Sequence, residues 1–408
     1  MKHIFKAVIE ATDPRKYGAA LQVNFWDGDN LHIGNRPAQA TLAFRAPIAL
    51  KRLLKEGSLG FGEEYMRGNI EIEGDMQHLI RVGLNSGLDT QNLPLQAKLA
   101  VALLRRQSSN TKARSATNIQ RHYDLGNDFY RLWLDPSMTY SCAYFKDEER
   151  SLEQAQADKY EHICRKLHLK KGESLVDIGC GWGGMLIYAA KHYGISGVGC
   201  TLSQQQYEYA CARIKEENLA EQVSIRLEDY RDLRGQFDKV VSIGMFEHVG
   251  KKYHTTFMQK IKELLNPGGF GVLHCITKDT PEKCDPWINK YIFPGGEIPA
   301  AGDVVQLLGD GDFILKDMEN LRRHYAMTLR EWSRRYERVV PALETSFGSH
   351  FVRMWRTYLN FSEAAFCCGK LHLHQFLFTR GTTDSYPLTR EHVYAEDLPP
   401  LSATPPGT

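Results

Sequence analysis

The sequence predicts an α/β protein that has a doubly wound, mostly parallel β-sheet and a smaller α+β domain at its N-terminus. The first observation is that apolar segments of strand length alternate with helical segments along most of the chain. The second is that one of these strands ends in a glycine-rich turn that leads directly into a helix. Such alternation builds parallel βαβ units, in which ligands bind at the carboxyl ends of the strands.

The larger domain is predicted to cover residues 121–395. Its apolar strands are expected at 174–178, 195–200, 223–227, 238–243 and 269–276. Helical segments are expected between them, at 184–193, 203–218 and 252–265. The sequence Asn266-Pro-Gly-Gly269 predicts a turn into the fifth strand.

The remainder of the chain divides into three parts. Residues 1–90 are predicted to form the α+β domain, with strands at 19–25 and 40–44 and a short helix at 46–54. Residues 91–120 combine an apolar helix with a basic, polar linker, and this stretch contains no acid. It fits either the interface of an anionic membrane or a helix packed on its own domain and followed by a solvated linker. Residues 396–408 have the composition of a disordered tail.

Composition excludes several classes of protein. The 408 residues are 42% hydrophobic and 25% charged, as in ordinary globular proteins, and the net charge of +2 argues against a nucleic-acid binder. No apolar run reaches the roughly 18 residues of a membrane span. The nine cysteines have no zinc-type spacing, so we expect no metal site, and reduced thiols in a cytoplasmic protein.

The glycine-rich turn is the strongest chemical signal. It follows the strand that contains Asp177 and includes Gly179, Gly181 and Gly183. Glycine lets bare backbone approach a ligand, whereas an acid before the turn would repel a phosphate. S-adenosylmethionine, with its sulfonium and ribose, suits this turn. A dinucleotide fingerprint also fits the glycine spacing, but it expects an acid about 20 residues later. The next strand ends instead in Thr201-Leu-Ser203, which disfavours NAD. A turn that binds no ligand is the remaining alternative.

Two polar residues follow neighbouring strands of the predicted sheet. Glu247 comes after the fourth strand and His274 lies at the end of the fifth, so both side chains could converge on one pocket. A salt-bridged glutamate and a buried structural histidine are the alternatives. Upstream, 122–130 and 138–145 mix aromatic and polar residues, and they predict either a lid over a cofactor or a helical cap.

Six motifs in order resemble one family. They are His122–Asn127, Tyr140–Cys142, Asp177–Gly183, Thr201–Ser203, Gly244–Gly250 and Trp287–Pro294. Together they resemble the cyclopropane-fatty-acyl-phospholipid synthases, relatives of the mycolic acid cyclopropane synthases. The similarity extends into the first 90 residues through Glu56–Gly60 and Glu64–Gly68. It implies a catalytic domain of the class I S-adenosylmethionine-dependent methyltransferase type and an N-terminal lipid-docking domain.

The resemblance also implies the reaction. The cis double bond of an acyl chain attacks the sulfonium methyl, a carbocation forms, and the loss of a proton closes a cyclopropane ring. A bound bicarbonate ion is the base in this family. By motif match, its site here consists of Glu247, His274 and Tyr325, with Cys142 and Ile276 contributing mainly backbone. The residues implied to bind S-adenosylmethionine are Tyr140, Ser141, Asp177, Gly179, Gly181, Gly183, Thr201, Gln206 and Tyr230.

Physical chemistry limits how such a site can work. A carboxylate beside an anion is unfavourable unless the two share a proton or His274 is charged. Nearby aromatic rings could stabilise a passing cation, and the sequence offers Tyr140, Phe145, Phe246 and Tyr325. Alternative activities are methylation that leaves a methylene- or methyl-branched chain, and lipid binding without catalysis. The resemblance implies a homodimer at the inner face of the membrane, acting on unsaturated phospholipid.

Overall fold

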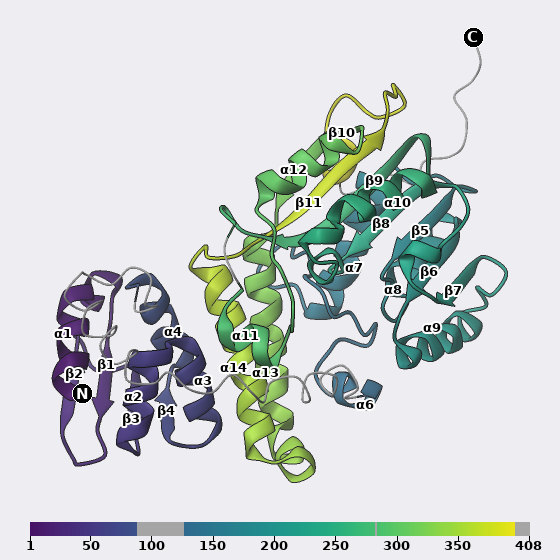
Figure 1. Ribbon diagram of the computed structural model, residues 1–408. Helices are drawn as coiled ribbons and strands as arrows, with labels where there is room; N and C mark the ends of the chain where they lie inside the picture. The colour runs from purple at the N-terminus through teal and green to yellow at the C-terminus, as the bar shows by residue number, and fades with distance from the viewer. Residues whose placement is uncertain (88–125, 282–283, 396–408) are drawn as a thin grey trace. The chain divides into compact units, whose positions relative to one another are not determined.

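The computed structural model describes residues 1–87, 126–281 and 284–395 (Figure 1). This part of the chain divides into two compact units. The first consists of 1–87, 284–294 and 329–370, and the second of 126–281, 295–328 and 371–395. The predicted helix and linker at 91–120 and the predicted tail at 396–408 lie outside the described residues.

The first unit contains a four-stranded sheet in the order β2-β1-β3-β4. The strands are β1 (Leu21–Asn24), β2 (Asn30–Ile33), β3 (Ala40–Phe44) and β4 (Ile70–Gly74). β1 is antiparallel to β2 and parallel to β3, and β3 is antiparallel to β4. The helices are α1 (Lys2–Thr12), α2 (Pro47–Glu56), α3 (Ser58–Met66) and α4 (Met76–Asn85). The predicted α+β architecture, both predicted strands and the helix at 46–54 are therefore confirmed.

Two segments from much later in the sequence belong to the same unit. They carry α11 (Pro286–Tyr291) and α14 (Ser349–Cys367). Phe361 of α14 packs against the apolar core of the small sheet, and Trp287 of α11 packs so closely on Gly62 that a Cβ there would lie 2.4 Å from the ring. Four short strands bury little apolar surface by themselves, and these helices complete the core. The division therefore differs from a continuous domain at 121–395.

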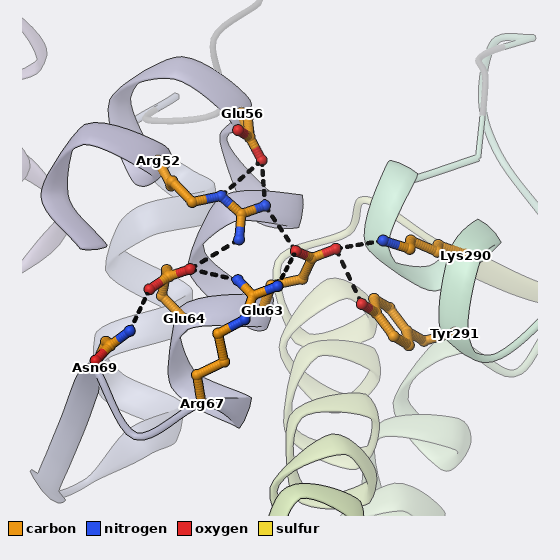
Figure 2. Close-up of polar contacts among 8 residues, drawn as sticks. All are labelled: Arg52, Glu56, Glu63, Glu64, Arg67, Asn69, Lys290 and Tyr291. Atoms are coloured by element: carbon orange, nitrogen blue, oxygen red, sulfur yellow. Dashed lines mark hydrogen bonds and ion pairs between the residues drawn. The ribbon is translucent and has the colours of Figure 1, made fainter. Parts of the chain in front are cut away.

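An ionic cluster links α2, α3 and α11 within this unit, and Figure 2 shows its side chains. Glu63 accepts hydrogen bonds from Arg52 (2.7 Å) and from Lys290 (2.6 Å). Glu64 accepts from Arg52 at 2.8 Å and also pairs with Arg67. Both carboxylates are buried, and buried charges persist in proteins only when they are paired in this way.

The second unit is built on a seven-stranded sheet in the order β10-β11-β9-β8-β5-β6-β7. Five strands match the predicted ones: β5 (Ser174–Ile178), β6 (Ser196–Thr201), β7 (Val223–Leu227), β8 (Phe237–Ile243) and β9 (Leu265–Thr277). These five strands pair in parallel, as the alternating pattern predicts. β10 (Phe313–Asn320) and β11 (His372–Arg380) were not predicted, and β11 is antiparallel to both neighbours.

The start of β9 corrects one prediction. The strand begins at Leu265 instead of 269, so the expected turn at 266–269 lies inside it. Leu265 pairs with Phe237, and the register shifts before Lys239 pairs with Phe270. The glycines therefore mark an irregularity within the strand, which is a common place for glycine in a sheet.

Helices cover both faces of the large sheet. The core on one face involves α7 (Leu152–Lys166), α8 (Gly184–Tyr193) and α9 (Gln204–Glu216). The core on the other involves α10 (His254–Leu264) and α12 (Ala301–Asp310). This is the predicted doubly wound arrangement. None of the described helices combines the length and apolar character that crossing a membrane requires. All nine cysteines are free thiols.

Candidate active site

The glycine turn after β5 adopts a backbone that requires glycine. Gly179, Gly181 and Gly183 have φ angles of 82°, 55° and 80°, in the left-handed region that other residues rarely adopt. A Cβ at Gly179 would also lie 2.6 Å from Cγ of Met245, which follows β8. The turn thus brings the carboxyl ends of β5 and β8 together. At Gly181, by contrast, no described residue other than its chain neighbours comes within 4 Å of the Cβ position, so the constraint seen there is the φ angle.

Asp177 lies in β5 just before this turn and has an unusual environment. Its side chain is buried, and Oδ1 has no hydrogen-bond partner among the described residues. Burial raises the pKa of Asp177 to about 7, although the charge of Lys159 acts in the opposite direction. A buried acid with a free oxygen is costly unless something fills that position. The site can therefore offer one carboxyl oxygen to a ligand that donates a hydrogen bond or carries positive charge.

Three more predicted cofactor residues lie beyond the glycine turn: Thr201 at the end of β6, Gln206 in α9, and Tyr230 after β7. Thr201 donates its hydroxyl to Gln206 Oε1 at 2.8 Å and accepts from the backbone of Ser203. Ser203 in turn caps the first turn of α9 by accepting from the backbone of Gln206. Tyr230, after β7, is buried edge-to-face against Phe257 at 5.3 Å. The two strand ends are thus fixed by local hydrogen bonds and by packing.

The segment 138–145 is fastened to the first turns of α13 (Arg322–Phe347). Ala143 donates its backbone N–H to Thr328 Oγ1 at 3.0 Å, and Phe145 donates to His324 Nδ1 at the same distance. Cys142 lies next to Ala143 in the segment, and Tyr325 lies between His324 and Thr328 on the helix. The two hydrogen bonds therefore hold the segment that carries Cys142 on the same helical turn that carries Tyr325.

The side chains of this segment are largely withdrawn from solvent. Cys142 is fully buried, and burial raises the pKa of its thiol well above the usual range, so it remains neutral. Tyr140 packs against the rings of Tyr130 and Trp133 at 5.3 and 5.7 Å. Ser141 Oγ accepts a hydrogen bond from Lys159 Nζ at 3.0 Å. The segment is therefore held in place by packing and hydrogen bonds, and its cysteine thiol is not ionised.

Glu247 follows β8 in a short 3-10 turn at Phe246–His248. Its Oε1 accepts the backbone N–H of Ile276 at 2.6 Å, while Oε2 is buried without a partner among the described residues. Burial raises the pKa of Glu247 to about 7, and the hydrogen bond from Ile276 partly opposes this shift. The structure thus brings two predicted site residues into contact and leaves one carboxyl oxygen free.

His274 in β9 is fully buried. Its Nδ1 lies 3.1 Å from Gln375 Nε2, and its Nε2 has no partner among the described residues. Burial, followed by the charge of Lys159, lowers the pKa of His274 well below its usual value. A positively charged His274 would stabilise an anion bound beside Glu247, but the lowered pKa disfavours that state. Such an anion would therefore have to share a proton with the carboxyl of Glu247.

One aromatic residue is not where the sequence predicts it. Phe246 packs in the core on the α10 face, stacked on His254 at 4.3 Å and close to Phe257 at 5.2 Å. It follows β8 as expected, but its ring turns into the hydrophobic core, where it is fully buried. Phe246 is thus a core residue, and the aromatic candidates that remain are Tyr140, Phe145 and Tyr325.

Sequence reasoning missed several buried polar residues near the site. They lie on α7 at helical spacing, and they are Gln156, Lys159, His162 and Lys166. Their spacing of three and four residues could have identified them, because it places polar residues on one face of a helix. Burial lowers the pKa of Lys159 to about 7, even though Asp135, Cys142 and Asp177 act in the opposite direction.

Comparison with known proteins agrees with this geometry. Residues 110–376 match the family described as mycolic acid cyclopropane synthetase, and 14–89 match a domain of unknown function. The chain is 41% identical over 359 residues to the cyclopropane-fatty-acyl-phospholipid synthase of Escherichia coli K12, covering 87% of this chain and 92% of that protein. It is 36% identical over 389 residues to a probable fatty acid methyltransferase of Pseudomonas putida, covering 92% and 96%.

Solved structures show the same relationship. The cyclopropane synthase MmaA2 from Mycobacterium tuberculosis superimposes with a TM-score of 0.62 at 32% identity, covering 66% of this chain and all of that one. A coclaurine N-methyltransferase, at 23% identity and a TM-score of 0.62 over 81% of this chain and 99% of that one, shares the fold. The chain therefore belongs to the mycolic acid cyclopropane synthetase family and is a homologue of S-adenosylmethionine-dependent cyclopropane-fatty-acyl-phospholipid synthase.

Proposed function

We propose that this protein transfers a methylene group from S-adenosylmethionine to the cis double bond of unsaturated acyl chains in membrane phospholipids, forming a cyclopropane ring. The observation that carries the proposal is a pair of buried polar atoms, Glu247 Oε2 and His274 Nε2, at the ligand-binding edge of the sheet. Neither atom has a hydrogen-bond partner in the described part of the chain. The 41% identity to the synthase of Escherichia coli supports the same substrate class.

S-adenosylmethionine fits the residues around the glycine turn. Asp177 offers a free carboxyl oxygen, and Gly181 leaves open space at its Cβ position. Thr201, Gln206 and Tyr230 stand at the next two strand ends, and Tyr140 and Ser141 belong to the facing segment. When bound, the cofactor supplies an electrophilic methyl group on a sulfonium. The role of these residues is to hold and orient it.

Bicarbonate also fits the chemistry of the residues proposed to bind it. The raised pKa of Glu247 leaves much of its carboxyl protonated near pH 7, so it can donate a hydrogen bond to an anion. The neutral ring of His274 can donate through Nε2, and the hydroxyl of Tyr325 is a further donor. The backbone N–H of Ile276 acts indirectly, because it holds the carboxyl of Glu247 in place. When bound, the ion supplies a proton acceptor. Cys142 and its neighbours help to keep water away from the reacting centre.

Tyr140, Phe145 and Tyr325 are proposed to stabilise positive charge on the acyl chain. The faces of aromatic rings attract cations, and this attraction is worth up to about 2 kcal/mol when water is absent. These rings also exclude water, which would otherwise trap the carbocation as an alcohol. We further propose that the first 90 residues dock on phospholipid at the inner membrane face, and that the protein acts there as a homodimer.

The direct test is incubation of the purified protein with labelled S-adenosylmethionine and vesicles of unsaturated phospholipid. We expect acyl chains that gain 14 Da and lose their double bond, detected by mass spectrometry. Glu247→Gln should lower kcat by at least about 100-fold, because acid–base groups typically contribute 10²–10⁴-fold. Cofactor affinity, measured by calorimetry, should change little. Equal loss of turnover and cofactor binding would contradict the role of Glu247.

A matched control is Glu263→Gln on α10, because that side chain is 65% exposed and pairs with Lys260. We expect it to retain the activity of the unmodified protein. Vesicle flotation and light scattering test the membrane and dimer proposals. A protein that stays in the aqueous fraction, or that remains monomeric at assay concentration, would contradict them.

A second candidate is a fatty-acid methyltransferase that makes branched chains. It is favoured by the 36% identity to the Pseudomonas putida protein and by 33% identity, over 88% of both chains, to the tuberculostearic acid methyltransferase UfaA1 of Mycobacterium tuberculosis. A product that gains 14 Da and keeps its unsaturation would identify the methylene-branched outcome. Vesicle binding without any change in the lipids would identify a lipid-binding protein.

A further inference from the structure

We propose that Gln375 is a positioning residue that fixes His274 in the tautomer that carries its proton on Nε2. The inference deepens the proposed function, because it specifies how His274 faces the reacting centre. Gln375 does not belong to any of the recognised sequence motifs, and it lies 101 positions from His274 along the chain.

The geometry follows from the pairing of β11 with β9. The two strands are antiparallel, and Gln375 lies directly opposite His274 in the register. Opposed residues in an antiparallel pair project from the same face, with Cβ atoms roughly 4.5–5.5 Å apart. Both side chains are fully buried, so water does not compete for their hydrogen bond. The contact of 3.1 Å between Gln375 Nε2 and His274 Nδ1 is thus determined by the sheet itself.

The direction of this hydrogen bond sets the state of the ring. An amide nitrogen can only donate, so Nδ1 of His274 must accept. The ring is neutral, because burial and the nearby charges of Lys159, Lys166 and His162 lower its pKa, while Glu319 opposes them only partly. A neutral imidazole that accepts at Nδ1 carries its one proton at Nε2. This Nε2 is buried and has no partner within the described ranges of the chain, so it becomes a fixed donor.

The residue that pairs with Gln375 on the other side of β11 does not compete with His274 for the amide N–H. Glu319 of β10 lies opposite Gln375 in the register and would be a strong competing acceptor. Its Oε2 already accepts from His162 at 2.6 Å and from Lys166 at 2.5 Å. Burial would raise the pKa of Glu319, but these partners outweigh burial and keep it well below the usual value. The carboxylate is therefore neutralised locally, and the amide N–H remains on His274.

The decisive substitution is Gln375→Glu, which keeps the size of the side chain and replaces the donor with an acceptor. A carboxylate opposite Nδ1 would draw the ring proton to Nδ1 and leave Nε2 as a lone pair. We expect kcat to fall by about 10–100-fold, the loss that is typical when the hydrogen-bond partner that orients a metal-binding histidine is removed. KM for phospholipid should change less than threefold, because Gln375 is not proposed to touch the lipid. A purely structural role would not produce this split.

The test combines that kinetic split with nitrogen NMR of ¹⁵N-histidine-labelled full-length protein, in which the His274 signal is identified by its loss in His274→Asn. The proposal expects an Nε2-protonated neutral ring in the unmodified protein and an Nδ1-protonated or charged ring in Gln375→Glu. An Nδ1-protonated ring in the unmodified protein would overturn it. So would full kcat in a Gln375→Glu variant whose ring has changed state.

Two further variants make the test robust. Gln375→Met removes the hydrogen bond without introducing an acceptor, so the His274 ring should exchange between both tautomers. This variant keeps the test available if Gln375→Glu does not fold. A ring that stays Nε2-protonated in Gln375→Met would overturn the proposal. Gln306→Glu, on the surface of α12, is the matched control for the charge change and should leave the NMR signal and kcat unaltered. The NMR result is independent of activity, so an unmodified protein that transfers no methyl group to phospholipid would refute the proposed function alone.

Discussion

Replacing Glu63 by glutamine should destabilise the first unit by about 2 kcal/mol. The Glu63 side chain is 5% exposed and accepts from Arg52, Arg67, Lys290 and Tyr291 (Figure 2). Burial would raise its pKa, but the hydrogen bonds from Lys290, Arg52 and Tyr291 outweigh burial and lower it from 4.5 to about 2. At about 1.4 kcal/mol per pKa unit, this shift corresponds to about 3 kcal/mol. Solvent screens the half-exposed Arg67 and Lys290, which reduces the expected loss to about 2 kcal/mol.

The assay is urea unfolding of the full-length protein and the Glu63→Gln variant at several pH values. A carboxylate whose pKa is lowered by folding stabilises the protein above its unfolded-state pKa, and this stabilisation is lost as pH falls through the folded-state value. The difference between the two proteins should therefore be full at pH 7 and shrink between about pH 4.5 and pH 2.

The matched control is Glu56→Gln. Glu56 also binds Arg52, but its side chain is 26% exposed and the expected loss is below about 1 kcal/mol. If Glu63→Gln loses no more stability than Glu56→Gln, or if its deficit does not depend on pH, the reasoning about buried paired charge is wrong.

Three further predictions concern the second unit. Gly183→Ala should lower stability by at least about 1 kcal/mol and weaken S-adenosylmethionine binding, because φ is 80° and the new Cβ would lie 3.2 Å from that of Ala210. An unchanged melting temperature and an unchanged affinity would contradict this prediction. Glu247→Gln should be more stable than the unmodified protein at pH 8 but not at pH 4, because a carboxyl whose pKa folding raises to about 7 destabilises the protein as pH rises from 4.5 through 7. Melting curves of both proteins at the two pH values test the sign of the stability difference. Lys159→Met should reduce cofactor affinity by about tenfold without unfolding the protein, because Ser141 loses its 3.0 Å partner, and calorimetry that finds unaltered affinity would rule out that role.

Local features of the fold are predictable because they depend on neighbouring residues. The predicted strand at 174–178 and helix at 184–193 coincide with β5 and α8, since hydrophobic periodicity and glycine in the turn act within a few residues. The last two strands were missed. Their segments contain charged and histidine residues such as Asp317, Glu319 and His372, which interrupt the apolar pattern that identified the other strands.

The candidate site also has features that the sequence predicts and features that depend on the folded structure. Sequence identified Glu247 and His274 because Glu247 follows one apolar strand and His274 lies near the end of the next, and the carboxyl ends of parallel strands meet at one edge. The backbone role of Ile276 in binding an ion stays a prediction, because in the structure its N–H donates to Glu247. The neutral state of His274 and the inward turn of Phe246 depend on burial, which a sequence does not determine.

The order of amino acids by itself determined the α/β class, the glycine turn and the type of chemistry that its strand ends can support, because these follow from short-range periodicity and residue type. Only the tertiary structure decided that 284–294 and 329–370 join the first unit and that Gln375 lies opposite His274. Strand register and helix packing bring together residues that are far apart in the chain, and the free energy of those contacts exists only once the layers have assembled.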